Sequence, residues 1–169
     1  MLGWVVALAC YQPFWSMISQ NYINYDSDGI VWGMWLQDHP YLYVLWGSMI
    51  LLLLVIYVLS TIAFGLRFSN LTHRGIITNG PYKYSKHPAY ISKSLSWWLI
   101  SIPFITEGPF YEAIRHMLLI LLLNYIYYLR AKTEERHLSW DPVYRQYAKY
   151  IDKNGWLPRL RRLVLKRAD

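Results

Sequence analysis

The sequence predicts an all-α integral membrane protein, a helical bundle of about four transmembrane helices followed by an amphipathic helix on the cytoplasmic side. Three observations predict this class. The chain of 169 residues is 55% hydrophobic and 18% aromatic, which exceeds the usual content of soluble domains. Its apolar runs reach the length that crosses a bilayer. Its Lys and Arg residues are absent before Gly65 and dense after Leu129, as the positive-inside rule describes.

The first part of the chain, residues 1–64, is expected to hold N-terminal membrane spans and an extracytoplasmic loop. Residues 1–19 are apolar, but Pro13 would end or kink a helix there, so this run either crosses the membrane or stops short. Residues 21–40 contain three Asp residues and no basic residue, which favours the extracytoplasmic side.

Residues 41–64 are the clearest span, because they contain no charged residue and would form a helix ~36 Å long. A shorter apolar run at residues 89–105 contains Lys93, and another span follows at residues 110–129. These two runs predict a hairpin with its turn at residues 106–109 outside the cell. The polar loop before the hairpin and the C-terminus would then both be cytoplasmic.

The second part of the chain, residues 65–158, is expected to be the catalytic region. Its last helix continues past the membrane, and Asp141-Pro142 predicts a stop and a restart, with Asp141 as N-cap. Apolar and aromatic residues after this span recur at helical spacing: Leu138, Val143, Tyr144, Tyr147 and Ile151. The third part, residues 159–169, is basic and apolar, and is expected to lie on an anionic membrane surface.

The net charge of +7 does not indicate nucleic-acid binding, because the basic residues lie beside apolar spans and are better explained by topology and anionic lipid. The single cysteine, Cys10, excludes an intrachain disulfide and a thiolate metal cluster. The histidines outside the loop before the hairpin are scattered, so no metal site is expected. The motifs of serine hydrolases, phosphate-binding loops and zinc proteases are also missing.

Two blocks carry the candidate chemistry. In the first, Lys86-His87-Pro88, the proline favours an extended His87 directly before a helix. Tyr90 then lies in the first turn of that helix, where unpaired N–H groups can hold a carboxyl group. Taken alone, this block is as readily explained by an interfacial histidine and proline at a helix start.

The second block is Arg130 with Glu134 and Glu135, directly after an apolar span. Arg130 and Glu134 are four residues apart, so they share one helix face. An ordinary ion pair of this kind contributes only ~0.3–0.5 kcal/mol. Charged groups at the end of a membrane span more often mark a site. Here they offer a carboxylate for a ligand ammonium and a guanidinium for a ligand carboxylate.

Together these blocks resemble the isoprenylcysteine carboxyl methyltransferase family, which belongs to a superfamily with the phospholipid methyltransferases. The resemblance covers roughly residues 67–158. It is carried by the segments Arg74-Gly-Ile-Ile-Thr-Asn-Gly-Pro-Tyr82 and Lys86-His-Pro-Ala-Tyr90, then by Arg130, Glu134, Glu135 and Leu138, and finally by Tyr144 and Tyr147.

The resemblance implies a helical membrane enzyme that uses S-adenosylmethionine to methylate a lipid or lipidated acceptor. It implies a substrate-positioning role for Arg130, and Glu135 is a possible further site residue. The residues implied to line the cofactor pocket are Arg74, Gly75, Ile76, Ile77, Tyr82, His87, Pro88, Ala89, Tyr90 and Glu134. The chain departs from the family at Lys86, where the family usually has Arg, and at residues 140–143, where it often has Phe-Gly.

The acceptor is most readily a carboxylate of a prenylcysteine-type substrate, which needs a positioning cation and no general base. An amine of a phospholipid would arrive protonated and need a base, which Glu135 or His87 could supply. Two other functions stay open: a sterol-type membrane reductase that uses NADPH, and a non-catalytic lipid-binding membrane protein. The reductases tend to have Arg-Asp and Cys near the last helix, where this chain has Glu134-Glu135 and no Cys.

Overall fold

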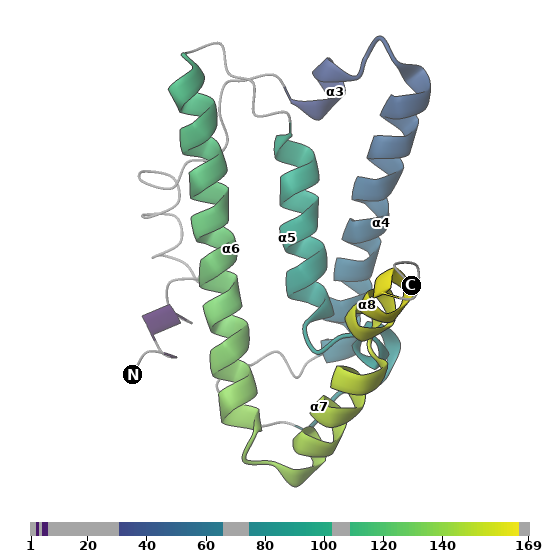
Figure 1. Cartoon of the computed structure of the whole chain (residues 1–169), viewed down its shortest axis with the longest axis vertical. Helices are drawn as coiled ribbons and strands as arrows, with labels where there is room; N and C mark the ends of the chain where they lie inside the picture. Colours follow the sequence, from purple (N-terminus) through teal and green to yellow (C-terminus); the bar gives the residue numbers. More distant parts are fainter. Residues whose placement is uncertain (1–2, 4, 7–30, 66–74, 103–108, 166–169) are drawn as a thin grey trace.

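The computed structural model describes residues 3, 5–6, 31–65, 75–102 and 109–165. Every regular element in these ranges is helical, as predicted: α3 (Trp32–Trp35), α4 (Pro40–Phe64), the 3-10 helix η2 (Gly80–Lys83), α5 (Pro88–Ser101), α6 (Phe110–Leu138), α7 (Pro142–Asn154) and α8 (Trp156–Leu165). Figure 1 shows α4, α5 and α6 running side by side along the long axis, with α7 at the end where α6 finishes.

Helix α4 forms where the clearest span is predicted. It has 25 residues, begins with Pro40 in its first turn and ends at Gly65, whose φ is 55°. Its apolar side chains face outward, with Leu51 63% and Leu52 60% exposed. Among the described helices, α4 is the one that is long and apolar enough to cross a membrane. Contact of this apolar face with lipid costs no free energy, whereas its exposure to water would be unfavourable.

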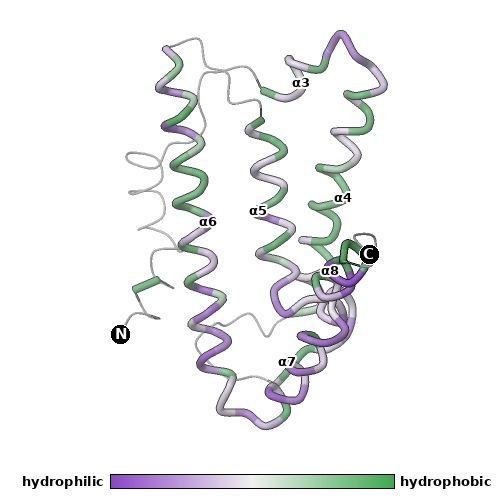
Figure 2. The backbone as a smooth tube through the Cα atoms, in the orientation of Figure 1, coloured by the Kyte–Doolittle hydropathy of each residue, from purple (hydrophilic) through white to green (hydrophobic). Residues whose placement is uncertain are grey.

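Helices α5 and α6 differ in length. The 14 residues of α5 span ~21 Å, and the 29 residues of α6 span ~44 Å. Helix α6 therefore joins the predicted span and its polar extension in one helix, and Figure 2 shows the change from green to purple along it. The expected span at residues 1–19 and the turn at residues 106–108 lie outside the described residues, so the count of four spans stays a prediction.

Small side chains lie between α4 and α5, the two helices that pack most extensively. Ser60 of α4 and Ser92 and Ser96 of α5 are buried. Each hydroxyl donates to a carbonyl of its own helix at 2.7 or 2.8 Å, so none is left unsatisfied in an apolar layer. Trp46 Nε1 donates to the Leu99 carbonyl across the helices at 2.8 Å. Small residues of this kind let membrane helices approach closely.

Helix α7 begins where the sequence predicts. Asp141 Oδ1 accepts a hydrogen bond from the Val143 N–H at 2.7 Å, as an N-cap. Tyr144, Tyr147 and Ile151 are buried on one face. Val143, which the sequence pattern grouped with these residues, does not share their burial, because its side chain is 60% exposed. Val143 lies ~100° around the helix from Tyr144, at the rim of the buried face.

The buried face of α7 fixes the loop that precedes α5. Tyr147 donates its hydroxyl hydrogen to the carbonyls of Tyr82 and Ser85, at 2.7 and 3.1 Å. Lys86 forms an ion pair with Asp152 at 2.7 Å. These contacts join residues more than sixty positions apart, so the loop containing η2 is held by the C-terminal part of the chain.

Helix α8 has no buried residue, although six of its ten residues are Leu, Val or Trp. Leu160, Leu163 and Val164 are exposed, as are Arg159, Arg161 and Arg162. A helix with exposed apolar and cationic side chains suits the interface of an anionic membrane, and this placement of the basic tail stays a prediction.

Gly155, between α7 and α8, allows the closest backbone approach. Its N–H donates to the Ile151 carbonyl at 2.7 Å, and the next N–H, of Trp156, donates to the Tyr84 carbonyl at 3.1 Å. A Cβ at Gly155 would lie 2.7 Å from the Ile151 oxygen and 2.9 Å from the Tyr84 oxygen. The junction therefore rests against the loop before α5 with no room for a side chain.

Gly155→Ala should lower the free energy of unfolding by about 1–3 kcal/mol, the usual cost of overpacking, and should reduce the melting temperature measured in detergent. The matched control is Gly33→Ala, whose added Cβ would meet the Tyr43 side chain at an ordinary 3.7 Å. Equal melting temperatures for Gly155→Ala and the wild-type protein would contradict the tight junction.

Candidate functional site

A cavity of about 290 Å³ lies at the end of the bundle where α4 and α6 finish and α5 begins. Its volume is near the lower limit for small-molecule sites. The loop before α5 and helix α7 close it. The lining residues among the described ranges are Tyr57, Thr61, Phe64, Gly75, Ile76, Ile77, Tyr82, Lys86, His87, Ala89, Tyr90, Lys93, Tyr127, Arg130, Glu134, Leu138, Tyr144 and Tyr147.

Each long helix contributes one stripe of side chains to this cavity. Neighbours in a stripe are three or four residues apart, except for Ala89, which directly precedes Tyr90 and lies four residues before Lys93, so the members of a stripe lie on one side of the helix. The stripes are Tyr57, Thr61 and Phe64 on α4, then Ala89, Tyr90 and Lys93 on α5, then Tyr127, Arg130, Glu134 and Leu138 on α6. The site is thus assembled from three helices, and its polar groups are fixed by helix packing.

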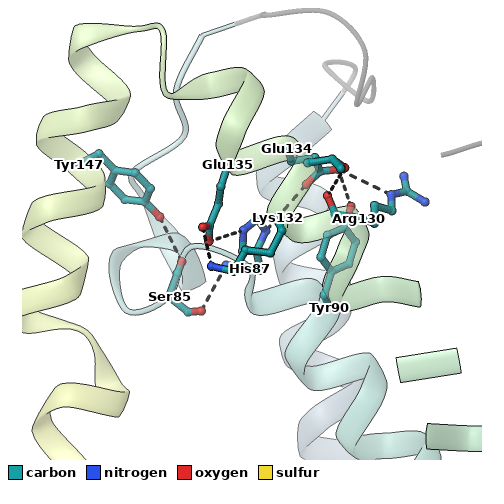
Figure 3. Close-up of polar contacts among 9 residues, drawn as sticks. Ser85, His87, Tyr90, Arg130, Lys132, Glu134, Glu135 and Tyr147 are labelled. Carbon is teal, nitrogen blue, oxygen red and sulfur yellow. Dashed lines mark hydrogen bonds and ion pairs between the residues drawn. The ribbon is translucent and has the colours of Figure 1, made fainter. Parts of the chain in front are cut away.

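Glu134 is the centre of the polar cluster (Figure 3). Tyr90 donates its hydroxyl hydrogen to Glu134 Oε1 at 2.6 Å. Arg130 Nε lies 3.6 Å from the same oxygen, and His87 Nδ1 lies 3.8 Å from Glu134 Oε2. Two helices and the loop before α5 therefore converge on one carboxylate.

Arg130 is a buried cation, only 7% exposed. Its Cζ atom lies 5.6 Å from the centre of the Tyr90 ring, a cation–π contact that contributes roughly 0.5–2 kcal/mol depending on desolvation. In Figure 3 the Nε edge of the guanidinium faces Glu134, while its terminal nitrogens point away from that carboxylate. The geometry holds the guanidinium in a fixed plane along the cavity wall.

Glu135 belongs to a different set of contacts and does not line the cavity. Its Oε1 lies 3.1 Å from His87 Nε2, and its Oε2 accepts a hydrogen bond from Lys132 at 3.0 Å. The hydrogen bond from His87 lowers the pKa of Glu135 to about 2. Glu135 thus stays ionised and orients the His87 ring from outside the cavity.

Three tyrosines form the wall on the side of α7. Burial raises the pKa of Tyr82, Tyr144 and Tyr147 well above the usual value, and the Glu134 carboxylate adds to this for Tyr82. All three therefore present neutral hydroxyl groups. The Tyr147 hydroxyl donates to carbonyls of the loop before α5. The buried Tyr144 hydroxyl has no hydrogen-bond partner in the described part of the chain. A buried hydroxyl of this kind is available to a ligand.

The structure brings most of the predicted site residues together. Arg130 lines the cavity, and so do eight of the predicted cofactor residues: Gly75, Ile76, Ile77, Tyr82, His87, Ala89, Tyr90 and Glu134. Pro88 does not line it; it occupies the first turn of α5. Arg74 lies outside the described residues.

The backbone at His87 differs from the prediction. Its φ of −132° is in the extended range, but its ψ of 58° is not. Pro88 does exclude the α conformation here, and the His87 carbonyl already accepts the first hydrogen bond of α5, from Ile91 at 3.1 Å. The backbone therefore turns at His87 to enter the helix, which aims the ring at Glu134 and Glu135.

Several lining residues were not predicted from the sequence. Tyr57 and Thr61 lie inside the longest apolar run, where one aromatic ring or hydroxyl gives no signal. Tyr127 and Lys93 had a usable signal. Tyr127 precedes Arg130 by three residues and Lys93 follows Tyr90 by three, which places each on the face of a predicted site residue.

A sequence model of the isoprenylcysteine carboxyl methyltransferase (ICMT) family matches residues 41–140. The chain belongs to this family. The match covers α4, α5, α6 and the loop before α5, and so contains every cavity residue except Tyr144 and Tyr147. We found no curated protein and no solved structure that matches the chain.

Membership of the ICMT family makes the protein a membrane-bound methyltransferase. It favours this function over a sterol-type reductase or a non-catalytic lipid-binding protein. The matched range begins earlier than the resemblance seen from sequence motifs and includes α4, which supplies one wall of the cavity. It ends before α7, which supplies another.

Proposed function

We propose that this protein is an S-adenosylmethionine-dependent methyltransferase whose acceptor is a lipid-like carboxylate, most readily that of a prenylcysteine-type substrate. One observation carries the proposal. A carboxylate and a guanidinium, Glu134 and Arg130, occupy one helix face in one cavity where three apolar helices meet. Such a pair suits a cationic methyl donor and an anionic acceptor at adjacent positions.

The cavity fits the chemistry of S-adenosylmethionine. Glu134 can bind the ammonium of the methionine part, and the orphan hydroxyl of Tyr144 can bind a polar group of the cofactor. Gly75, whose φ of 89° favours glycine, begins the segment 75–77 that lines one wall of the cavity. Aromatic faces such as that of Tyr90 favour a sulfonium as they favour other cations.

The residues of the chain supply binding, orientation and exclusion of water. When bound, S-adenosylmethionine supplies a methyl group on a positive sulfur. An acceptor carboxylate would already be ionised, so the residues of the chain would not have to move a proton. Arg130 would orient the carboxylate bidentately, and the surrounding rings would remove water from it.

An amine acceptor is less well supported. It would need a base in the cavity, but Glu135 lies outside the lining and its pKa of about 2 makes it a poor proton acceptor. Within the lining, Glu134 is already in contact with Tyr90 and Arg130. His87, the other candidate base, has its two ring nitrogens facing Glu135 and Glu134, at 3.1 and 3.8 Å. The exposed apolar faces of α4 and α6 would let the tail of a lipid-like acceptor stay in the bilayer while its polar end enters the cavity.

The cavity end should face the cytoplasm, because most Lys and Arg residues of the described helices lie at that end and the first 64 residues contain none. In a Cys10→Ser background, cysteines introduced at exposed Asn79 and Lys153 should be protected from an impermeant maleimide added to intact cells. A cysteine at exposed Asp38, beside the opposite end of α4, is the control and should be labelled. Labelling of Asn79→Cys from outside would reverse the orientation.

Glu134→Gln should weaken S-adenosylmethionine binding by about 1.5–3 kcal/mol, the range for a charged hydrogen bond, as measured by calorimetry. Glu112→Gln is the matched control, since Glu112 pairs with Arg115 at 3.0 Å in the first turn of the same helix and lies away from the cavity. Unchanged affinity in Glu134→Gln would remove Glu134 from the cofactor site.

Arg130→Lys and Arg130→Ala should reduce methyl transfer to a prenylcysteine acid at least roughly tenfold, or ~1.4 kcal/mol of transition-state stabilisation. Lysine keeps the charge but loses the planar fork. Methyl transfer from labelled S-adenosylmethionine is measured to the prenylcysteine acid and to phosphatidylethanolamine, which is the amine acceptor. Oxidation of NADPH is measured separately to test for a reductase reaction.

The wild-type protein should label the acid and neither alternative. Cofactor affinity and melting temperature should stay near wild type in both Arg130 variants, and Arg115→Lys is the control. Wild-type turnover in Arg130→Ala would exclude Arg130 from the acceptor site.

A further inference from the structure

Lys93 places an ammonium group inside the apolar part of the bundle. It lies on α5, one turn beyond Tyr90, on the same helix face, and its half-buried side chain lines the cavity. A lysine in this layer is costly, so its presence at a cavity calls for a functional reason. The proposed roles of Glu134 and Arg130 do not use it.

The ammonium of Lys93 is held by aromatic groups. Its Nζ lies 4.8 Å from the centre of the Trp97 ring, 5.1 Å from that of Tyr127 and 5.8 Å from that of Tyr57. It also donates a hydrogen bond to the Tyr127 hydroxyl at 3.2 Å. Rings from α4, α5 and α6 therefore surround one cation, which stabilises its charged form and fixes its position.

Lys93 and Arg130 lie on either side of one pair of rings. Tyr127, in contact with Lys93, packs edge to face on Tyr90 with 5.7 Å between ring centres. The Tyr90 ring in turn lies 5.6 Å from the Arg130 Cζ atom. Side chains lean toward the N-terminus of their own helix. Because α5 begins at the cavity end of the bundle, this lean directs the Lys93 side chain toward that end. Because α6 ends there, the same lean directs the Arg130 side chain toward the middle of the bundle. The lean therefore reduces the difference in depth between the two cations.

We propose that Lys93 is the second cation of the acceptor site and that, together with Arg130, it selects an acceptor carboxylate on a lipid chain over the neutral ester that methylation produces. This inference rests on the proposed function. Conversion of the carboxylate to the methyl ester removes the negative charge, so both cations lose their attraction for the product. Lys93 thereby binds the substrate and favours release of the product into the bilayer.

The experiment measures equilibrium binding to the full chain in phosphatidylcholine nanodiscs without cofactor. The probes are N-acetyl-S-farnesylcysteine, its methyl ester and its carboxamide, which share one tail and differ in charge. The wild-type protein should bind the acid more tightly than either neutral probe. Lys93→Met should weaken acid binding roughly 10- to 100-fold, the range for one charged contact, and leave binding of the ester and the carboxamide unchanged.

Two further variants keep the test decisive. Lys93→Gln removes the charge but keeps a polar group, so it should also lose the acid preference. It replaces Lys93→Met in the test if that variant fails to fold. Lys149→Met makes the matched change at an exposed lysine of α7 outside the cavity lining, and should keep the preference. A merely structural role for Lys93 would weaken all three probes alike and would overturn the proposal, as would an intact acid preference in Lys93→Met.

The failure of each proposal gives a distinct result. Wild-type protein that prefers the acid but transfers no methyl group to it would overturn the proposed function and leave the acid site at Lys93 in place. Wild-type protein that methylates the acid, together with a Lys93→Met variant of unchanged selectivity, would overturn Lys93 alone. Farnesyl phosphate is included as a competitor, and tighter binding of this phosphate than of the acid would overturn the choice of a carboxylate.

Discussion

The site depends on one constraint: charged groups in the apolar part of a bundle must be stabilised by one another or by aromatic rings. Glu134 shows this most clearly, because it accepts the Tyr90 hydroxyl from α5 while lying on α6 near Arg130. The contact between Lys93 and Tyr127 repeats the same solution deeper in the bundle. The polar contacts that form the candidate site are therefore also the ones that tie α5 to α6.

Local signals in the sequence were enough to predict α4, α5, α6 and α7, but not the short helices α3 and η2. The uncharged run at residues 41–64 became α4, and Asp141-Pro142 gave the break between α6 and α7 with its N-cap. The pairing of Arg130 with Glu134 also followed from spacing within one helix. In each case the information lies within a few residues, and no other part of the chain is needed to read it.

Contacts between distant segments could not be predicted in this way. Glu134 and Glu135 are adjacent and chemically alike, yet only Glu134 lines the cavity, because ~100° around the helix separates them. Tyr57 became a cavity residue because α4 packs on α5, which no local pattern encodes. Tyr147 likewise has its partners more than sixty residues away.

The attachment of α7 to the loop before α5 has a consequence for how the protein is made. The residues that close the cavity on this side, Tyr144 and Tyr147, follow α4, α5 and α6 in chain order. Synthesis proceeds from the N-terminus, so those helices can enter the bilayer before the last wall exists. The newly inserted bundle has Arg130 and Glu134 in place, but its chamber stays open until α7 has been synthesised and packs on the loop before α5.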